Sequence, residues 1–138
     1  MKRAVPYLFF NGNCREAMAF CQRCFGGELQ LLTYGEGPEG ACPDGAQPDT
    51  DEIMHACLTK GDFCLMASDW PQSGAKPGNN VHLNLECETM AEIEKLFADL
   101  SDGGTVVQPL QDAFWGSRFG MLIDRFGTHW MLNYPLNG

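Results

Sequence analysis

The sequence has few basic residues and no long apolar run. Only 9 of its 138 residues are Lys or Arg, against 18 Asp or Glu, which gives a formal net charge of -9. Because nucleic acids and anionic membranes are bound through clustered Lys and Arg side chains, this deficit argues against both as partners. No stretch approaches the roughly 20 apolar residues that span a bilayer. The apolar start becomes polar at Asn11, too early for a secretory signal, so we expect a cytoplasmic protein.

The sequence also lacks the signs of a disulfide framework. Its seven cysteines are odd in number, and most fall inside predicted helices and strands, which is typical of reduced thiols. Cys21 and Cys24 have the CxxC spacing of redox sites but lie in the middle of a predicted helix. Redox pairs place the first thiol at a helix N-terminus, which lowers its pKa. Packing in the core is therefore the better interpretation of this pair.

What the sequence does contain is a repeat. In each half, a strand leads to a helix that begins with a capping box, Asn13 to Glu16 or Thr89 to Glu92, and ends at a Gly-Gly pair. Three strands follow, the last two joined tightly through Gly61 or Gly127. The predicted strands cover 3–10, 28–34, 53–60 and 62–68 in the first half, and 80–87, 105–109, 118–124 and 128–134 in the second.

The repeat predicts an α+β fold. We interpret residues 1–138 as a single domain of two βαβββ modules, the first at about 1–70 and the second at about 78–138. Each module covers one sheet face with its helix and leaves the other face bare. We expect the modules to combine into a curved, mostly antiparallel eight-stranded sheet around a shared cavity, with the helices on the outer face.

Alternation along the strands predicts which side chains face that cavity. In the strand over 80–87, Val81, Leu83, Leu85 and Cys87 are apolar and should face the helices. The opposite rows combine polar, aromatic and sulfur-containing side chains, which is typical of a mixed ligand pocket. The predicted lining is Tyr7, Phe9, Cys64, Met66, His82, Asn84, Glu86, His129, Met131 and Asn133.

Several segments resemble one known family. These are residues 6–14 (PYLFFNGNC), 65–69 (LMASD), 114–120 (FWGSRFG) and 124–133 (DRFGTHWMLN). Together with the repeat, they resemble the PhnB-like branch of the vicinal oxygen chelate superfamily, which includes glyoxalases, bleomycin resistance proteins and extradiol dioxygenases. The resemblance implies paired βαβββ modules and a homodimer, but no single reaction.

The resemblance also implies where a divalent metal would bind. In metal-dependent members, His and Glu from the first and last strands of each module chelate the ion; the matching positions here are Val5 or Tyr7, Met66, His82 and Met131. Thioethers are poor ligands for a hard divalent ion, so we predict no cofactor and disfavour a metal. An atypical site of His82, Glu86 and His129 stays an alternative.

Two further groups have more than one interpretation. In one interpretation, Trp115 stacks on a planar ligand and Arg118 binds the carboxylate or phosphate of that ligand. In the other, Phe114 and Trp115 close a dimer interface and Arg118 pairs with an Asp. Cys64 faces the predicted cavity, but no neighbouring base marks it as a nucleophile.

A long acidic loop lies between the second and third strands. It holds Glu36, Glu39, Asp44, Asp49, Asp51 and Glu52. As a lid it would favour a cationic ligand; as an ordinary charged loop it is simply solvated.

The sequence thus predicts a protein that binds a small organic molecule without the usual chelated metal. The alternative is a lyase, isomerase or dioxygenase that uses an atypical metal site or His82 and His129 as acid and base. A scaffold that only forms pairs is a weaker third hypothesis. The sequence leaves open whether any reaction is catalysed.

Overall fold

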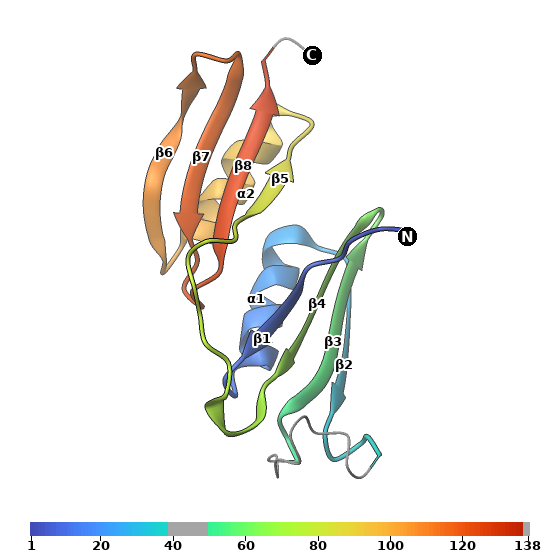
Figure 1. Cartoon of the computed structure of the whole chain (residues 1–138). Coiled ribbons are helices and arrows are strands. Elements are labelled where there is room, and N and C mark those ends of the chain that lie inside the picture. Colours follow the sequence, from blue (N-terminus) through green and yellow to red (C-terminus); the bar gives the residue numbers. More distant parts are fainter. Residues whose placement is uncertain (39–49, 137–138) are drawn as a thin grey trace. The chain divides into compact units, whose positions relative to one another are not determined.

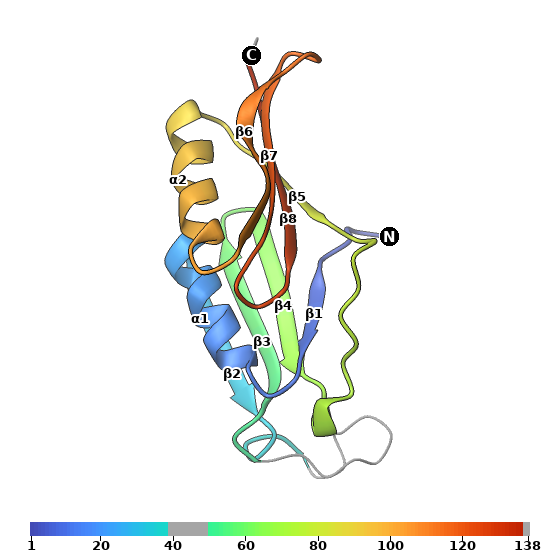
Figure 2. The same ribbon diagram turned by 90° about the vertical axis from the view of Figure 1, so that its left-hand side faces the viewer.

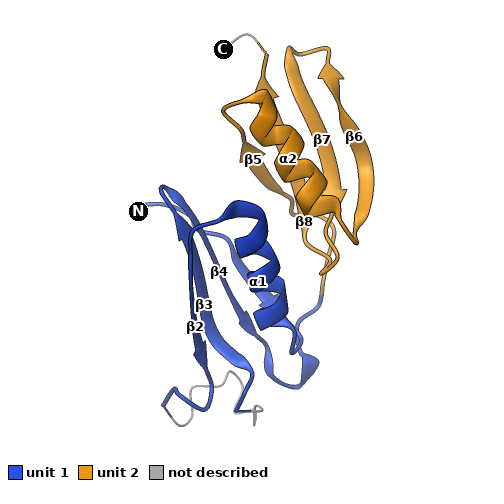
Figure 3. Cartoon of the chain, turned by 180° about the vertical axis from the view of Figure 1, so that it is seen from behind, with its two compact units in different colours: residues 1–76 blue, residues 77–138 orange. Residues whose placement is uncertain are grey.

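The structure is a computed structural model that describes residues 1–38 and 50–136 (Figure 1). The chain divides into two compact units, residues 1–76 and 77–138 (Figure 3). Unit 1 contains β1 (Tyr7–Phe10), α1 (Cys14–Phe25), β2 (Glu28–Thr33), β3 (Ile53–Lys60), β4 (Phe63–Asp69) and a 3-10 turn over Pro71–Ser73. Unit 2 contains β5 (Leu83–Glu86), α2 (Met90–Ser101), β6 (Thr105–Ala113), β7 (Ser117–Ile123) and β8 (His129–Pro135).

Both units have the same topology. The strand order is β1-β4-β3-β2 in unit 1 and β5-β8-β7-β6 in unit 2. In each sheet the first pair is parallel and the other two pairs are antiparallel. The predicted α+β fold of two βαβββ modules is therefore confirmed, with the eight strands paired as two sheets of four.

Each helix covers one face of its own sheet (Figure 2). In unit 1 the covered face includes Leu58, Leu65 and Ala67, all fully buried. In unit 2 the ring of Phe97 lies so close to β7 that a Cβ on Gly120 would come within 2.6 Å of it. The helices thus bury the apolar rows and leave the opposite face of each sheet without a helix. Neither described helix is long and apolar enough to cross a membrane.

The repeated Gly-Gly pairs have a repeated function. Gly26 and Gly103, just after the two helices, have φ of 77° in the left-handed region that favours glycine. The second glycine of each pair lies against the sheet neighbour of the strand that it precedes. A Cβ on Gly27 would collide with the carbonyl of Thr59 on β3, and a Cβ on Gly104 would collide with the carbonyl of Ile123 on β7. The pair thus ends the helix and lets the following strand begin in contact with its neighbour.

Three local predictions were wrong. The Asn13 side chain makes no capping hydrogen bond; the Asp69 carboxylate of β4 accepts from the amides of Gly12 and Cys14 instead, both at 2.9 Å. The strand predicted from residue 80 begins at Leu83, and Val81 is 71% exposed rather than facing a helix. The strand predicted over 105–109 continues to Ala113.

The first strand also differs from the prediction, whereas the cap of α2 agrees with it. The first strand is shorter than predicted, beginning at Tyr7. Thr89 caps α2 as predicted, with its hydroxyl accepting from the Glu92 amide at 3.0 Å. The Glu92 carboxylate binds the Glu88 amide rather than that of Thr89. Of the acidic loop, Glu39, Asp44 and Asp49 lie outside the described residues, so the predicted lid stays a prediction.

Candidate functional site

The uncovered face of unit 2 carries the polar row that the sequence predicts. In β8, Trp130 and Leu132 are buried on the helix side, and His129, Met131 and Asn133 alternate with them. The register places Met131 opposite Asn84, and Asn133 opposite Glu86. We call this set the unit 2 face. It consists of His82, Asn84, Glu86, His129, Met131 and Asn133.

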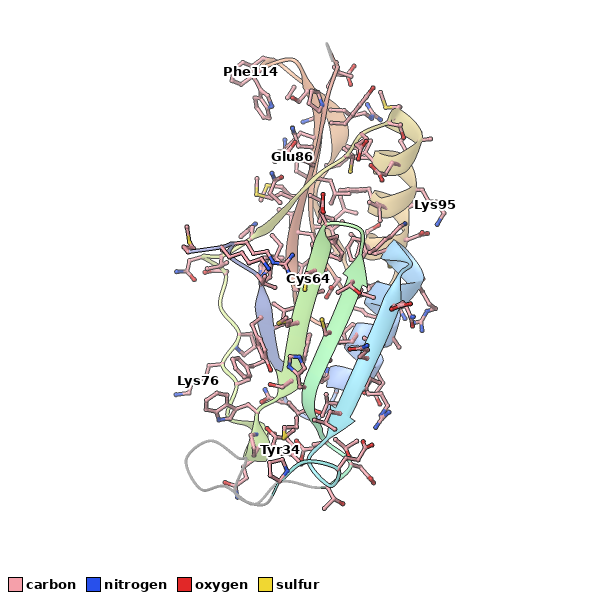
Figure 4. The ribbon with its side chains drawn as sticks, turned by 90° about the vertical axis from the view of Figure 1, so that its right-hand side faces the viewer. Tyr34, Cys64, Lys76, Glu86, Lys95 and Phe114 are labelled. Carbon is pink, nitrogen blue, oxygen red and sulfur yellow. The ribbon has the colours of Figure 1, made fainter. Side chains whose placement is uncertain are left out.

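An amide and carboxylate network lies in the centre of the unit 2 face. The Nδ2 of Asn84 donates to Oε1 of Glu86 at 2.8 Å, and the Nδ2 of Asn133 donates to Oε2 at 3.0 Å. Figure 4 labels Glu86 on β5. Because an amide has two N–H groups and a carbonyl oxygen, each Asn keeps a donor and an acceptor for another molecule. Glu86 therefore fixes the orientation of two groups that can recognise a ligand.

Two imidazole rings lie beside one another on the same face. The ring centroids of His82 and His129 are 4.8 Å apart, with the planes tilted by 40°. The Nε2 of His82 donates to the Asn79 carbonyl at 3.1 Å, since a carbonyl can only accept. This leaves Nδ1 of neutral His82 as an acceptor, and that atom is buried with no partner among the described residues. A buried acceptor without a partner costs free energy that a ligand's donor would recover.

The uncovered face of unit 1 carries aromatic and sulfur-containing side chains. The rings of Tyr7 and Phe9 are 40% and 48% exposed, with centroids 5.1 Å apart. The hydroxyl of Tyr7 lies 3.2 Å from Nδ1 of His55 on β3. We call this set the unit 1 face. It consists of Tyr7, Phe9, His55, Cys57, Cys64 and Met66.

His55 and Cys57 also lie on the unit 1 face, although neither is in the predicted lining. The sequence alone leaves open which sheet face the His55 side chain is on. His55 shares the odd-numbered row of its strand with Ile53, which is fully buried on the covered face. The register shifts where Thr33 pairs with Ile53, directly after Leu32 pairs with His55. This irregularity turns His55 and Cys57 to the uncovered face. Simple alternation along the strand cannot reveal it.

The structure separates Arg118 from the other predicted ligand-binding residues. Its guanidinium lies 3.2 Å from the Asp112 carboxylate and 3.6 Å from that of Glu94 on α2. Arg118 pairs with Tyr134, on the row of β8 that faces the helix, so it does not join the unit 2 face. The interpretation in which Arg118 pairs with an Asp is confirmed by Asp112, and its role in holding a ligand anion stays a prediction.

Trp115 lies in the hairpin that joins β6 and β7. Its ring packs edge to face on Phe114 and on Phe119, with centroids 5.0 and 5.5 Å apart. Phe119 is paired with Asn133 in the sheet and therefore lies on the same side as the unit 2 face. Phe119 is not in the lining predicted from the sequence. Phe114 is 98% exposed at the tip of the hairpin (Figure 4).

Comparison with known proteins identifies the family. Residues 3–132 match the family described as the Glyoxalase/Bleomycin resistance protein/Dioxygenase superfamily. The chain belongs to this superfamily. It is 37% identical to Protein YjdN of Escherichia coli over 136 residues, covering 93% of this chain and 92% of that protein.

Solved structures of other bacterial proteins share this fold. Protein PA1353 from Pseudomonas aeruginosa is 42% identical, with a TM-score of 0.84 and 98% of each chain covered. A PhnB protein from Bacillus cereus, described as a putative 3-demethylubiquinone-9 3-methyltransferase, is 23% identical with a TM-score of 0.73, covering 96% of this chain and 99% of that one. The second likeness concerns the fold alone. The resemblance seen in the sequence is therefore confirmed.

The residues at the superfamily's metal positions do not fit a hard divalent ion. Met66 and Met131 offer only thioethers, which are poor ligands for such an ion. The atypical set of His82, Glu86 and His129 is not brought together as a group of metal ligands in the structure. Among the described residues, no three His, Cys, Asp or Glu side chains are grouped as such a site requires.

Proposed function

We propose that the chain binds a small organic molecule on the unit 2 face, without the divalent metal of other superfamily members. The network in which Glu86 orients Asn84 and Asn133 carries this proposal. Fixed amides beside a pair of imidazole rings offer hydrogen bonds at one end and a flat contact surface at the other. These groups suit a planar, polar molecule.

The charge of the chain favours a neutral or cationic ligand. Glu86 is the carboxylate of the unit 2 face, and the chain as a whole carries a formal net charge of -9. A negative field attracts cations to the surface and slows the approach of anions. The free thiols of Cys57 and Cys64 fit a reducing compartment, so we place this activity in the cytoplasm.

Ligand binding is tested with untagged protein in EDTA. Thermal shift and equilibrium dialysis against planar cationic and neutral compounds should identify at least one ligand. Asn133→Ala should weaken that binding at least tenfold, because it removes one fixed amide. The matched control is Asn80→Ala, a change to an exposed amide outside the network. If no compound binds, or if Asn133→Ala and Asn80→Ala behave alike, the proposal fails.

The histidine pair supports a second candidate, an enzyme of the lyase, isomerase or dioxygenase type. Two imidazoles with ring centroids 4.8 Å apart can serve as a general acid and a general base for one bound molecule. In that case His82→Asn and His129→Asn should each abolish turnover of a bound compound while leaving its affinity within a few fold. Turnover that survives both changes would exclude acid and base roles for the two residues.

We further propose that the chain forms a homodimer through the β6–β7 hairpin. Phe114 and Trp115 place large exposed rings there, and Val106 and Val107 of β6 are exposed as well. Light scattering should give twice the chain mass for the natural protein and one chain mass for a Phe114→Glu, Trp115→Glu variant. A natural protein of one chain mass at micromolar concentration would contradict this proposal.

A further inference from the structure

Three sulfur-containing residues are neighbours on the unit 1 face. Antiparallel pairing of β3 and β4 puts Cys57 opposite Met66 and Thr59 opposite Cys64. Cys57 and Cys64 are therefore diagonal neighbours, and Met66 lies directly across from one and two residues from the other. Side chains across such a pair have Cβ atoms about 4.5–5.5 Å apart, within reach of a methionine thioether. Figure 4 labels Cys64 on β4.

The spacing of the two thiols suits a bridging ion better than a direct bond. Their Sγ atoms are 3.9 Å apart. A disulfide needs about 2.05 Å between sulfurs and Cα atoms within about 7 Å, whereas diagonal neighbours have Cα atoms roughly 7–8 Å apart. With metal–sulfur bonds of about 2.3 Å, two sulfurs on one ion lie roughly 3.8–4.0 Å apart. The sulfurs already have this separation.

The donors decide which ion fits. Two thiols and a thioether are soft ligands, which favour Cu(I) over hard ions. Zn(II) normally takes four ligands from Cys, His, Asp or Glu, and among the described residues no three such side chains are grouped to hold a metal. We propose that Cys57, Cys64 and Met66 bind one Cu(I) ion. All three residues belong to unit 1, whereas the organic ligand is assigned to residues of unit 2.

The chemistry of binding balances without a redox step. Each thiol that binds releases its proton to solvent, and copper stays Cu(I), so no electron is transferred. Burial, the hydrogen bond to Cys64 and the charge of Cys64 raise the pKa of Cys57, while the positive charge of Arg3 opposes this. Without an ion, Cys57 is therefore a protonated thiol rather than a ready nucleophile. Arg3 also lies where it offsets the negative charge of a bound dithiolate.

The test uses the full, untagged chain, reduced and treated with EDTA under anaerobic conditions. Cu(I) is titrated against a coloured Cu(I) chelator, and Zn(II) against a zinc dye in a parallel titration. Cys57→Ser and Cys64→Ser should each weaken Cu(I) binding at least 100-fold, and Met66→Leu about tenfold. Cys24→Ser, a half-buried cysteine of α1, is the matched control and should leave binding unchanged. X-ray absorption of the loaded protein should show sulfur ligands only.

Each outcome decides the proposal. The Cu(I) site is ruled out if the chain does not compete with the chelator for Cu(I). It is also ruled out if Cu(I) binding survives both Cys57→Ser and Cys64→Ser, or if Zn(II) binds more tightly than Cu(I). Thermal unfolding of every variant confirms that lost binding is not lost folding. If Cys57→Ser does not fold, Met66→Leu and the absorption spectrum of the natural protein still decide the ligand set.

Discussion

Asp69 connects three segments of unit 1 through one carboxylate. It is 1% exposed, and its Oδ1 accepts from the amides of Gly12 and Cys14 while Oδ2 accepts from that of Ile53 at 2.9 Å. These bonds join the end of β4 to the start of α1 and the start of β3. A buried carboxylate with three backbone donors is strongly favoured over any side chain that leaves those donors unpaired.

Asp69→Ala should therefore lower the free energy of unfolding by about 3 kcal/mol, because three backbone amides, those of buried Cys14 and Ile53 among them, lose their acceptor. Asp69→Asn keeps one acceptor oxygen and should cost less. Urea unfolding measures both. The control is Asp62→Ala in the exposed turn before β4, which should change stability by less than about 0.5 kcal/mol. Equal effects of Asp62→Ala and Asp69→Ala would contradict this role.

Cys87 predicts a dependence of stability on pH. Burial, aided by the charges of Glu92 and Glu86, raises the pKa of its thiol from 9.0 to about 11. The folded state therefore keeps a proton that the unfolded state loses first. The contribution to stability is complete below pH 9 and is lost as pH rises toward 11.

This dependence is measured as a difference between the natural protein and Cys87→Ala. Urea unfolding at several pH values should show the stability of the natural protein falling relative to the variant above pH 9. A difference that stays constant from pH 8 to pH 11 would show that the thiol titrates alike in both states.

At the scale of the helix, the two N-termini show what local sequence can and cannot predict. Thr89 precedes α2 by one residue, so the pattern of Thr89 and Glu92 was sufficient to predict its cap. The group that caps α1 is Asp69, which is 55 residues from Cys14 in sequence. No local pattern identifies such a partner, and Asn13 was the nearest candidate. The shift in register between β2 and β3 escaped prediction for the same reason.

Thr89→Ala should destabilise the protein by about 1 kcal/mol, since the Glu92 amide loses its acceptor. Asn13→Ala is the matched change at α1 and should cost only a few tenths of a kcal/mol, because its side chain makes no capping bond. Urea unfolding of the pair measures the contrast. A larger loss for Asn13→Ala would reverse the assignment of the caps.

At the scale of the whole chain, the repeat made the fold predictable. The Gly-Gly pairs and the tight joints at Gly61 and Gly127 fix the order of elements twice, and alternation then divides each strand between two faces. The network around Glu86 also follows from alternation, which placed Asn84, Glu86 and Asn133 on one side. The pairing of Arg118 with Glu94 could not be predicted, because it depends on how α2 packs. That both uncovered faces line one cavity stays a prediction.

The most direct test of ligand recognition by the unit 2 face follows the side-chain amide signals of Asn84 and Asn133 by NMR. A ligand from the binding screen is added in the presence of EDTA. If the unit 2 face binds the ligand without a metal, both pairs of N–H signals shift and saturate together with the measured affinity. The side-chain amide signals of Asn80 do not shift. Signals that stay fixed while the compound binds, or that move only after a divalent ion is supplied, would contradict metal-free recognition by the unit 2 face.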